Sequence, residues 1–90
     1  MHFEWDTKKA IANRRKHGIT FEEASSALRD SFSATARDPD HSDDEERFVT
    51  LGLSSLGRLL AVSHTDRGDA VRIISARVTT NAERLIYEEG

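Results

Sequence analysis

The sequence contains no cysteine, and it has only one proline among its 90 residues. Without cysteine the chain has no disulfide, no thiolate metal site and no cysteine nucleophile, which favours a reducing, cytoplasmic location. Long apolar runs are also missing. The longest, residues 59–62, is far shorter than the roughly 20 residues that a membrane-spanning helix needs. The first residues show no basic segment followed by an apolar stretch, so we expect no signal peptide.

The chain also lacks the excess of positive charge that is typical of nucleic-acid-binding proteins. Its net charge is −3, and its calculated isoelectric point is about 5.8. Residues 1–18 hold five Lys and Arg against two acids, whereas residues 19–47 hold nine acids against three Arg. We therefore expect no strong nonspecific grip on nucleic acid. The separate basic segments still offer local contacts to phosphates or to an acidic partner protein.

The length and the hydropathy pattern predict one α+β domain over residues 1–90. A strand is expected over residues 2–5, followed by a helix that begins after Asp6 and ends near Lys16, before Gly18. A second helix is expected to begin at a Thr20–Glu23 capping box, and a C-terminal helix at a Thr80–Glu83 capping box. Alternating residues between them predict four further strands, over residues 32–37, 47–53, 58–65 and 70–77. This order is typical of helices packed on an antiparallel sheet.

The apolar alternation of two neighbouring strands suggests their register. If Leu53 pairs with Arg58, then Arg47 lies opposite His64, and both side chains project from one face of the sheet. An adjacent arginine and histidine at the end of an apolar ladder would suit chemistry on a phosphate.

Several motifs occur in an order that resembles one known family. Near the N-terminus they are Phe3-Glu4-Trp5-Asp6, Lys9, Asn13, Lys16-His17-Gly18 and Phe21-Glu22-Glu23-Ala24. In the middle they are His41-Ser42, Glu45-Glu46-Arg47, Gly52, Ser54, Gly57-Arg58-Leu59-Leu60, Val62, His64-Thr65 and Arg67-Gly68. At the end they are Arg72-Ile73-Ile74-Ser75-Ala76-Arg77, Glu83-Arg84 and Tyr87-Glu88-Glu89. This ordered set resembles the BrnT toxins of bacterial type II toxin–antitoxin pairs, within the RelE-like superfamily.

The resemblance implies a RelE-like ribonuclease fold and an endoribonuclease that cleaves RNA to arrest growth. It also implies neutralisation by a BrnA-type antitoxin, which binds operator DNA, so that this chain would reach DNA only indirectly. Many RelE-like toxins are strongly basic, and this chain is acidic. That departure favours the alternative function, a noncatalytic module of the same fold that acts through its antitoxin and operator complex.

Metal-free RNA cleavage needs groups that move protons and groups that hold phosphate oxygens, and no cofactor is expected. A histidine has a pKa suited to proton transfer, and arginine forks suit phosphates. We expect His64 to transfer a proton, with Glu46 as a second base or as a partner of an arginine. Arg47 and Arg77 would hold the scissile phosphate. Arg67 and Arg72 would contact flanking phosphates.

Each of these residues also has a structural interpretation. A single histidine at a strand end is more often structural than catalytic, and Arg47 with Glu46 would form an ordinary surface ion pair. Arg58 follows a glycine turn, is expected to be solvated and is left out of the site.

Four other features of the sequence have more than one interpretation. His41 lies in an acidic stretch that suggests a metal site but lacks the spacing of a calcium loop, so we favour a solvated loop. One helix face holds Lys9, Asn13 and Lys16. Three interpretations stay open for it: contact with RNA, docking of the antitoxin, or simple solvation. Tyr87 also has three interpretations: it stacks on an RNA base, it acts as an acid, or it packs against the fold with its hydroxyl in water. Trp5 is assigned to the core, with stacking on RNA as the less favoured alternative.

Overall fold

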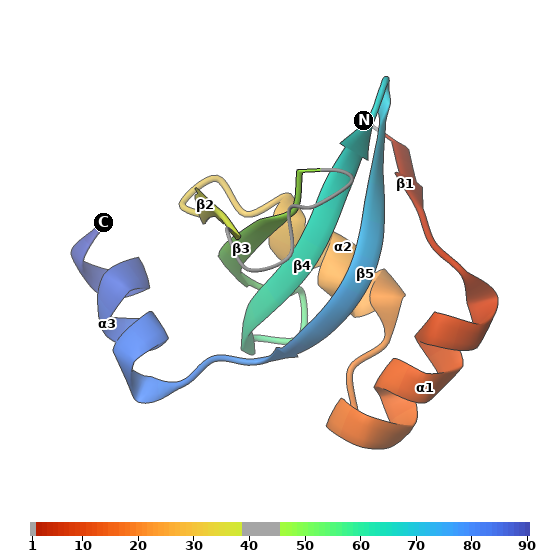
Figure 1. The fold of residues 1–90 in the computed structure, drawn as a ribbon. Helices are drawn as coiled ribbons and strands as arrows, with labels where there is room; N and C mark the ends of the chain where they lie inside the picture. Colours follow the sequence, from red (N-terminus) through yellow and green to blue (C-terminus); the bar gives the residue numbers. More distant parts are fainter. Residues whose placement is uncertain (1, 39–45) are drawn as a thin grey trace.

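The computed structural model describes residues 2–38 and 46–90. Its elements, in chain order, are β1 (His2–Glu4), α1 (Thr7–His17), α2 (Phe21–Leu28), β2 (Ala34–Arg37), β3 (Phe48–Leu53), β4 (Leu59–Arg67), β5 (Ala70–Val78) and α3 (Asn81–Glu89). The strands form one sheet in the order β1-β5-β4-β3-β2 (Figure 1). The acidic stretch with His41 lies outside the described residues. No helix in the described part of the chain is long and apolar enough to cross a membrane.

The predicted α+β class is confirmed, with one difference in the sheet. β2, β3, β4 and β5 pair antiparallel in chain order, as expected of a meander. β1 instead pairs parallel with β5, placing His2 opposite Ala70. A parallel pair needs a long connection, and here α1, α2 and the other strands together provide it.

The two N-terminal helices begin where the sequence predicts, and α1 ends at His17, one residue after the predicted end near Lys16. Asp6 caps α1 by accepting hydrogen bonds from the backbone amides of Lys8 and Lys9, at 2.8 and 3.2 Å. Gly18 follows the helix with φ 71°, a conformation that costs glycine little. α2 approaches β3 closely at Gly52, where a Cβ atom would lie 2.1 Å from the carbonyl oxygen of Ala27. A glycine is therefore required at this helix–sheet contact.

The two faces of the sheet differ in what covers them. The buried core lies on one face, which we call the packed face, where Leu60, Val62 and Ala76 belong to the same buried cluster as Phe21 of α2. Trp5, assigned to the core from the sequence, packs against this cluster and meets Phe21 edge to face. The other face, which we call the open face, carries alternate residues such as Ala61 and Arg77. In Figure 1, α2 lies behind the sheet, α1 beside β5 and α3 beyond the opposite side.

The predicted register between β3 and β4 is wrong by one residue. Leu53 pairs with Leu59, not with Arg58, and Phe48 pairs with His64. The hairpin closes through a hydrogen bond from the Ser54 amide to the Arg58 carbonyl at 2.8 Å, which fixes this pairing. A one-residue shift moves a side chain to the other face of the sheet. Arg47 and His64 therefore do not project from the same face.

Candidate active site

Three arginines that the sequence singles out project from the open face. Arg77 pairs with Ala61, and Arg72 pairs with Thr65. Arg47 precedes Phe48, a packed-face residue, so alternation puts it on the open face. Thr65 is four positions after Ala61 on β4, so Arg77 is about 13 Å along the sheet from the row of Arg72. The open face thus carries positive charge at both ends.

Two serines occupy the sheet between these ends. Ser63 of β4 pairs with Ser75 of β5 and lies on the open face, between the rows of Ala61 and Thr65. Both serines are partly exposed. A negatively charged ligand on this face would meet hydroxyl groups between the arginines, and hydroxyls are hydrogen-bond donors for phosphate oxygens.

Arg77 is held by Glu83, the residue that also caps α3. Its two terminal nitrogens donate to the two carboxylate oxygens of Glu83, at 2.7 and 2.9 Å. The side chain of Arg77 is 43% exposed and that of Glu83 22%. The hydrogen bonds from Arg77, more than any other contact, lower the pKa of Glu83 to about 2. This two-point contact is the geometry in which a guanidinium also binds a phosphate.

The other predicted arginines have different surroundings. Arg72 donates to a carboxylate oxygen of Glu4 on β1 at 3.0 Å. The Nε atom of Arg47 is buried and has no hydrogen-bond partner among the described residues. Arg67 is the exposed last residue of β4. Of the four arginines expected at phosphates, Arg47, Arg72 and Arg77 share the open face, and Arg67 lies at the tip of the β4–β5 hairpin.

His64 lies on the packed face and is buried. Only 7% of the residue is exposed, and its ring stacks on Phe48 with the centroids 5.8 Å apart. Its Nε2 atom is hydrogen bonded to the Thr50 hydroxyl at 2.7 Å, and Thr50 bonds Thr35 on β2. Burial lowers the pKa of His64, and the nearby Asp66 opposes this shift. The imidazole is therefore neutral near pH 7, on the opposite side of the sheet from Arg77.

Glu46 pairs with an arginine other than the one anticipated. One of its carboxylate oxygens lies 3.7 Å from a terminal nitrogen of Arg37 on β2, and both side chains are about 60% exposed. An exposed ion pair of this kind stabilises little. The surface pair expected between Glu46 and Arg47 is replaced by Glu46 with Arg37.

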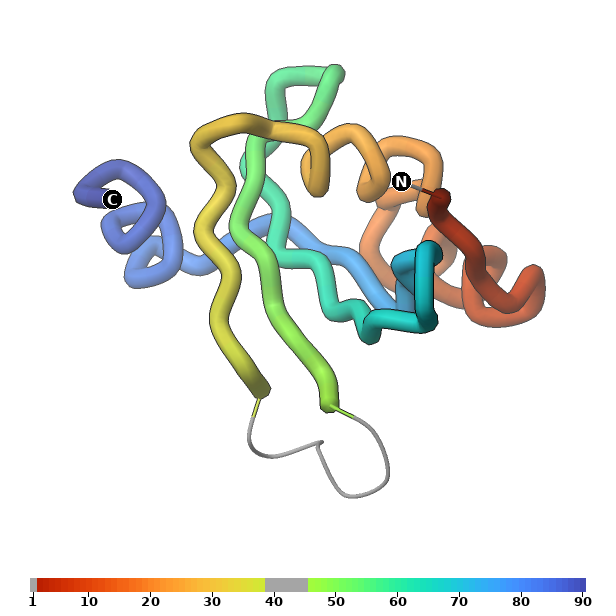
Figure 2. Tube along the Cα trace, turned by 90° about the horizontal axis from the view of Figure 1, so that it is seen from above, coloured from red at the N-terminus to blue at the C-terminus, as the bar shows by residue number. Residues whose placement is uncertain are grey.

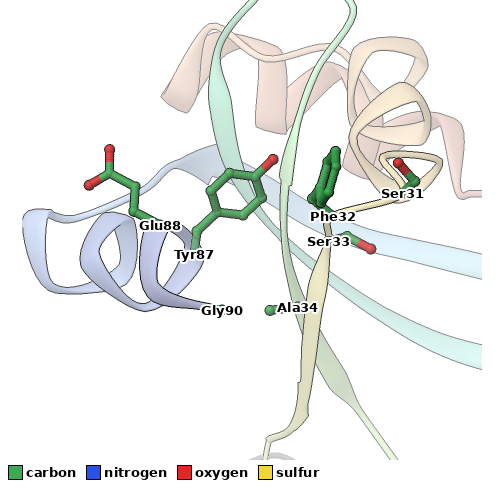
Figure 3. A pocket seen from close by; sticks show the side chains of 7 residues that line it. All are labelled: Ser31, Phe32, Ser33, Ala34, Tyr87, Glu88 and Gly90. Carbon is green, nitrogen blue, oxygen red and sulfur yellow. The ribbon is translucent and has the colours of Figure 1, made fainter.

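Tyr87 lies one helical turn after Glu83 on α3. Its hydroxyl donates to Asp30 Oδ2 at 2.5 Å, and this hydrogen bond raises the pKa of the phenol. Beside it is a hollow of about 540 Å³ into which the Phe32 ring also projects (Figure 3). Phe32 is 80% exposed, so an aromatic surface is available here. None of the residues of α3 is buried, so the helix is held largely by its polar contacts.

The basic helix α1 uses its three singled-out residues differently. Asn13 is buried, and its amide donates to the carbonyls of Ile19 and Ala76 and accepts from the Ala76 amide, at 2.9–3.0 Å. It bonds the edge of β5 as a neighbouring strand would. The sequence suggested that Asn13 lies on a surface that contacts RNA or the antitoxin. The structure corrects this, because the buried Asn13 amide holds α1 to β5. Lys9 and Lys16 are exposed.

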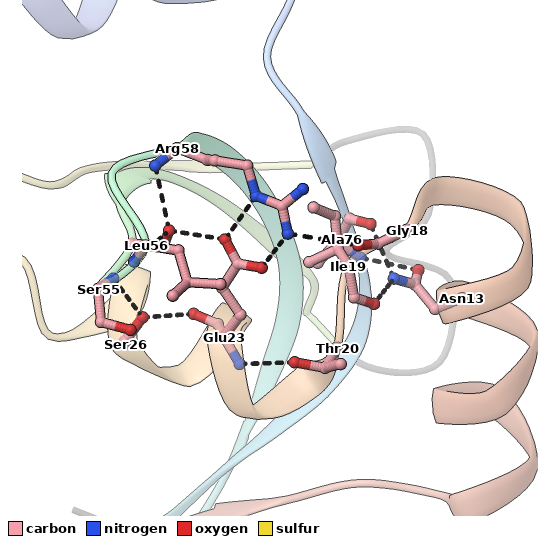
Figure 4. Close-up of polar contacts among 11 residues, drawn as sticks. Asn13, Gly18, Ile19, Thr20, Glu23, Ser26, Ser55, Leu56, Arg58 and Ala76 are labelled. Atoms are coloured by element: carbon pink, nitrogen blue, oxygen red, sulfur yellow. Dashed lines mark hydrogen bonds and ion pairs between the residues drawn. The ribbon is translucent and has the colours of Figure 1, made fainter.

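Sequence reasoning missed a second pair of a glutamate with an arginine, on the packed side. Glu23 does not complete a capping box; its side chain is 4% exposed and pairs with Arg58. It also accepts a hydrogen bond from the Ser54 hydroxyl at 2.7 Å (Figure 4). These contacts, first the hydrogen bonds from Arg58, lower the pKa of Glu23. Arg58, expected to be solvated, instead ties the β3–β4 turn to α2.

The described residues contain no group of three His, Cys, Asp or Glu side chains that could hold a metal ion. The cationic groups on the open face are arginines, whose charge is permanent. The chemistry available on this face is therefore the binding and charge stabilisation of an anion.

Comparison with known proteins identifies the family. Residues 5–83 match the model of the ribonuclease toxin BrnT of type II toxin–antitoxin systems. The chain belongs to this family of ribonuclease toxins, as its motifs suggested. The fold agrees with the 1.1 Å crystal structure of the Brucella abortus ribonuclease toxin BrnT, with a TM-score of 0.65 and 25% sequence identity. The match covers 90% of this chain and 99% of that one. A search of curated proteins gave no match.

Membership of this family implies an RNA substrate and an antitoxin partner. It also favours the enzyme over the noncatalytic alternative that the acidic charge suggested.

Proposed function

We propose that this toxin cleaves RNA on the open face of its sheet, without a metal ion, through the 2′-hydroxyl of the substrate. The observation that carries the proposal is the arginine-lined open face, with Arg77 half-exposed at one end. In this reaction the 2′-hydroxyl loses its proton to water or to a side-chain base as its oxygen attacks the adjacent phosphorus. The bond between phosphorus and the 5′-oxygen breaks, and the 5′-oxygen takes up a proton. The products carry a 2′,3′-cyclic phosphate and a 5′-hydroxyl.

Arg77 binds the scissile phosphate in this proposal. Negative charge grows on the phosphate oxygens as the 2′-oxygen attacks, and a fixed guanidinium stabilises that charge more than it stabilises the substrate. The two-point contact of Arg77 with Glu83 supports this role, because a carboxylate and a phosphate both present a pair of oxygens to the guanidinium. RNA must displace Glu83 to bind.

Arg47 and Arg72 bind a neighbouring phosphate at the far end of the open face. The distance of about 13 Å along the sheet favours this division over a shared contact of Arg47 and Arg77 with one phosphate. Arg67, at the hairpin tip, contacts RNA beyond them. Tyr87 is proposed to stack on a base near Arg77, since Glu83 and Tyr87 lie four residues apart on one helix face.

For His64 we propose a packing role in place of the proton transfer that the sequence suggested, whereas the role expected of Glu46 stays a prediction. The buried, Thr50-bonded imidazole favours a packing role for His64. Neutralisation by a BrnA-type antitoxin, growth arrest and a cytoplasmic location are also proposed on the basis of the family.

The test is cleavage of a defined RNA by the purified chain, with EDTA present and ribosomes absent. We expect products with 2′,3′-cyclic phosphate ends, and no such products from Arg77→Ala. His64→Ala should lose stability but keep cleavage by the folded fraction within a few-fold. Full activity of Arg77→Ala would contradict the proposed site, and products with 3′-hydroxyl ends would contradict the proposed chemistry.

A further inference from the structure

Helix α1 carries more cationic side chains than any other described helix or strand. It carries five Lys and Arg and no acidic residue. None of these five forms an ion pair with a described residue, whereas Arg37, Arg58, Arg72 and Arg77 each have a carboxylate partner. The contrast is notable in a chain with more acids than bases. These four arginines each meet a carboxylate within the fold, whereas the α1 cations meet none among the described residues and can bind an external anion.

Part of this charge borders a hollow between α1 and β5. The hollow has a volume of about 310 Å³, and its polar lining includes Lys9, Lys16, His17 and Ser75. Lys9 and Lys16 are seven residues apart, so they lie about 10 Å apart along one side of the helix. Asn13, between them, fixes this side of α1 against β5 through its hydrogen bonds to Ala76. The two lysines therefore stand at a defined distance from the sheet.

The hollow is continuous with the open face. Ser75, at its β5 wall, projects from the open face, where it pairs with Ser63. Arg77 is two residues further along β5 and on the same face, about 7 Å away. A chain bound at Arg77 can therefore pass over Ser75 and reach the lysines. Figure 2 shows α1 at the end of the molecule opposite α3, so the hollow extends the site away from Glu83.

We propose that the hollow between α1 and β5 binds the backbone of the RNA beyond the scissile phosphate, through Lys9 and Lys16 with His17 and Ser75 beside them. The inference rests on the proposed function of the open face and adds a second phosphate-binding region to it. RNA is favoured over an antitoxin segment because the hollow runs into the arginine-lined face. A line of cationic side chains from the hollow to Arg77 fits the regularly spaced negative charges of an RNA backbone.

The test measures binding of a 12-nucleotide RNA with 2′-O-methyl groups, which cannot be cleaved through its 2′-oxygen. The variant is Lys9→Ala with Lys16→Ala. The matched control is Lys8→Ala with Arg15→Ala, which removes the same charge at the same spacing from the same helix but outside the hollow. We expect the first variant to weaken binding about tenfold at 0.15 M salt, with its thermal stability unchanged. The slope of log K against log salt should fall by about 1.4, as for two lost phosphate contacts.

The control should change the slope by less than half as much. Equal changes in both variants would overturn the proposal. They would show that α1 attracts RNA only through its overall positive charge and not through contacts in the hollow. Unchanged RNA binding with weaker binding of the antitoxin of the same pair would also overturn it, and would assign the hollow to the antitoxin. Arg77→Ala separates this inference from the proposed function. If Arg77→Ala cleaves RNA normally while the lysine variant loses RNA affinity, the catalytic site is wrong and the hollow stands.

Discussion

Helices α2 and α3 begin with the same Thr-x-x-Glu pattern, yet the two glutamates have different roles. At α3, Glu83 accepts a hydrogen bond from the Thr80 amide at 2.9 Å and completes the capping box. At α2, Thr20 caps the helix, but Glu23 turns away to Arg58 and Ser54. The motif fixes where each helix begins. It does not fix what its acid binds.

The two helices also differ in how they are held. α2 buries Phe21, Ala24 and Ala27 completely, so apolar packing holds it. α3 buries no residue, and Ile86 is 57% exposed. One Glu–Arg pair therefore lies against a packed core, and the other lies on the open face beside a loosely held helix. The first stabilises the fold, and the second is available to function.

Arg77→Ala gives the largest expected effect on this comparison. Loss of the guanidinium should lower the rate of RNA cleavage by about 100- to 1,000-fold, as when a group that stabilises transition-state charge is removed. Single-turnover cleavage measures the rate, and chemical denaturation confirms that the variant is folded. Arg58→Ala is the paired control, and it should lose stability but retain the rate of its folded fraction. If Arg58→Ala instead lost cleavage and Arg77→Ala lost only stability, the Arg58–Glu23 pair would be the functional one and the Arg77–Glu83 pair the structural one.

Glu23→Ala tests the packed-side pair. The Arg58 side chain is 41% exposed, so water can solvate it once its partner is removed, but the buried Ser54 hydroxyl loses its acceptor. The free energy of unfolding should therefore fall by about 1.5 kcal/mol. Urea denaturation measures it. Glu22→Ala, at the exposed neighbouring position, should change it by less than about 0.5 kcal/mol. A similar small change in both variants would show that the Glu23 pair adds no stability.

The pKa of Glu83 predicts an acid-sensitive contact. Because its folded value, about 2, is below the ordinary 4.5, the contact stabilises the protein above pH 4.5 and is lost as the pH falls towards 2. The 43% exposure of the Arg77 side chain limits this contribution to about 1 kcal/mol. The difference in unfolding free energy between the native chain and Glu83→Gln should therefore be larger at pH 7 than at pH 3. A difference independent of pH would contradict an ionised Glu83.

Glu83→Gln also gives the smallest expected effect, on RNA affinity. The amide keeps an oxygen for the Thr80 amide but removes the charge that competes with phosphate for Arg77. Affinity for the 2′-O-methyl RNA should rise about threefold, which corresponds to about 0.7 kcal/mol. Glu88→Gln, an exposed position on the same helix, controls for the change in net charge. An equal gain in both variants would remove the competition argument.

Local signals predicted the elements well. Asp6 and Gly18 marked the ends of α1, and the two Thr-x-x-Glu patterns marked the starts of α2 and α3. The register of β3 and β4 was not predictable, because residues 59–62 are buried on both faces of the sheet. An apolar pattern cannot choose between two registers where the residues of both faces are apolar and buried, as Leu59 and Ala61 on the open face and Leu60 and Val62 on the packed face are. The hydrogen bond between Ser54 and Arg58 made that choice.

The candidate site was predictable in composition but not in arrangement. The sequence indicated Arg47, Arg72 and Arg77, and strand alternation gathers them on one face. It gave no sign that His64 lies on the other face, since that depends on the register.

The sequence by itself determined the helix boundaries, the strand order of the meander and the family, because caps, turns and motifs act within a few residues. Only the tertiary structure decided which acid each arginine meets and which histidine is buried. It also decided that Asn13 is held at β5 while Lys9 and Lys16 stay free. Those outcomes depend on how elements distant in the sequence pack together, and no local pattern carries that information.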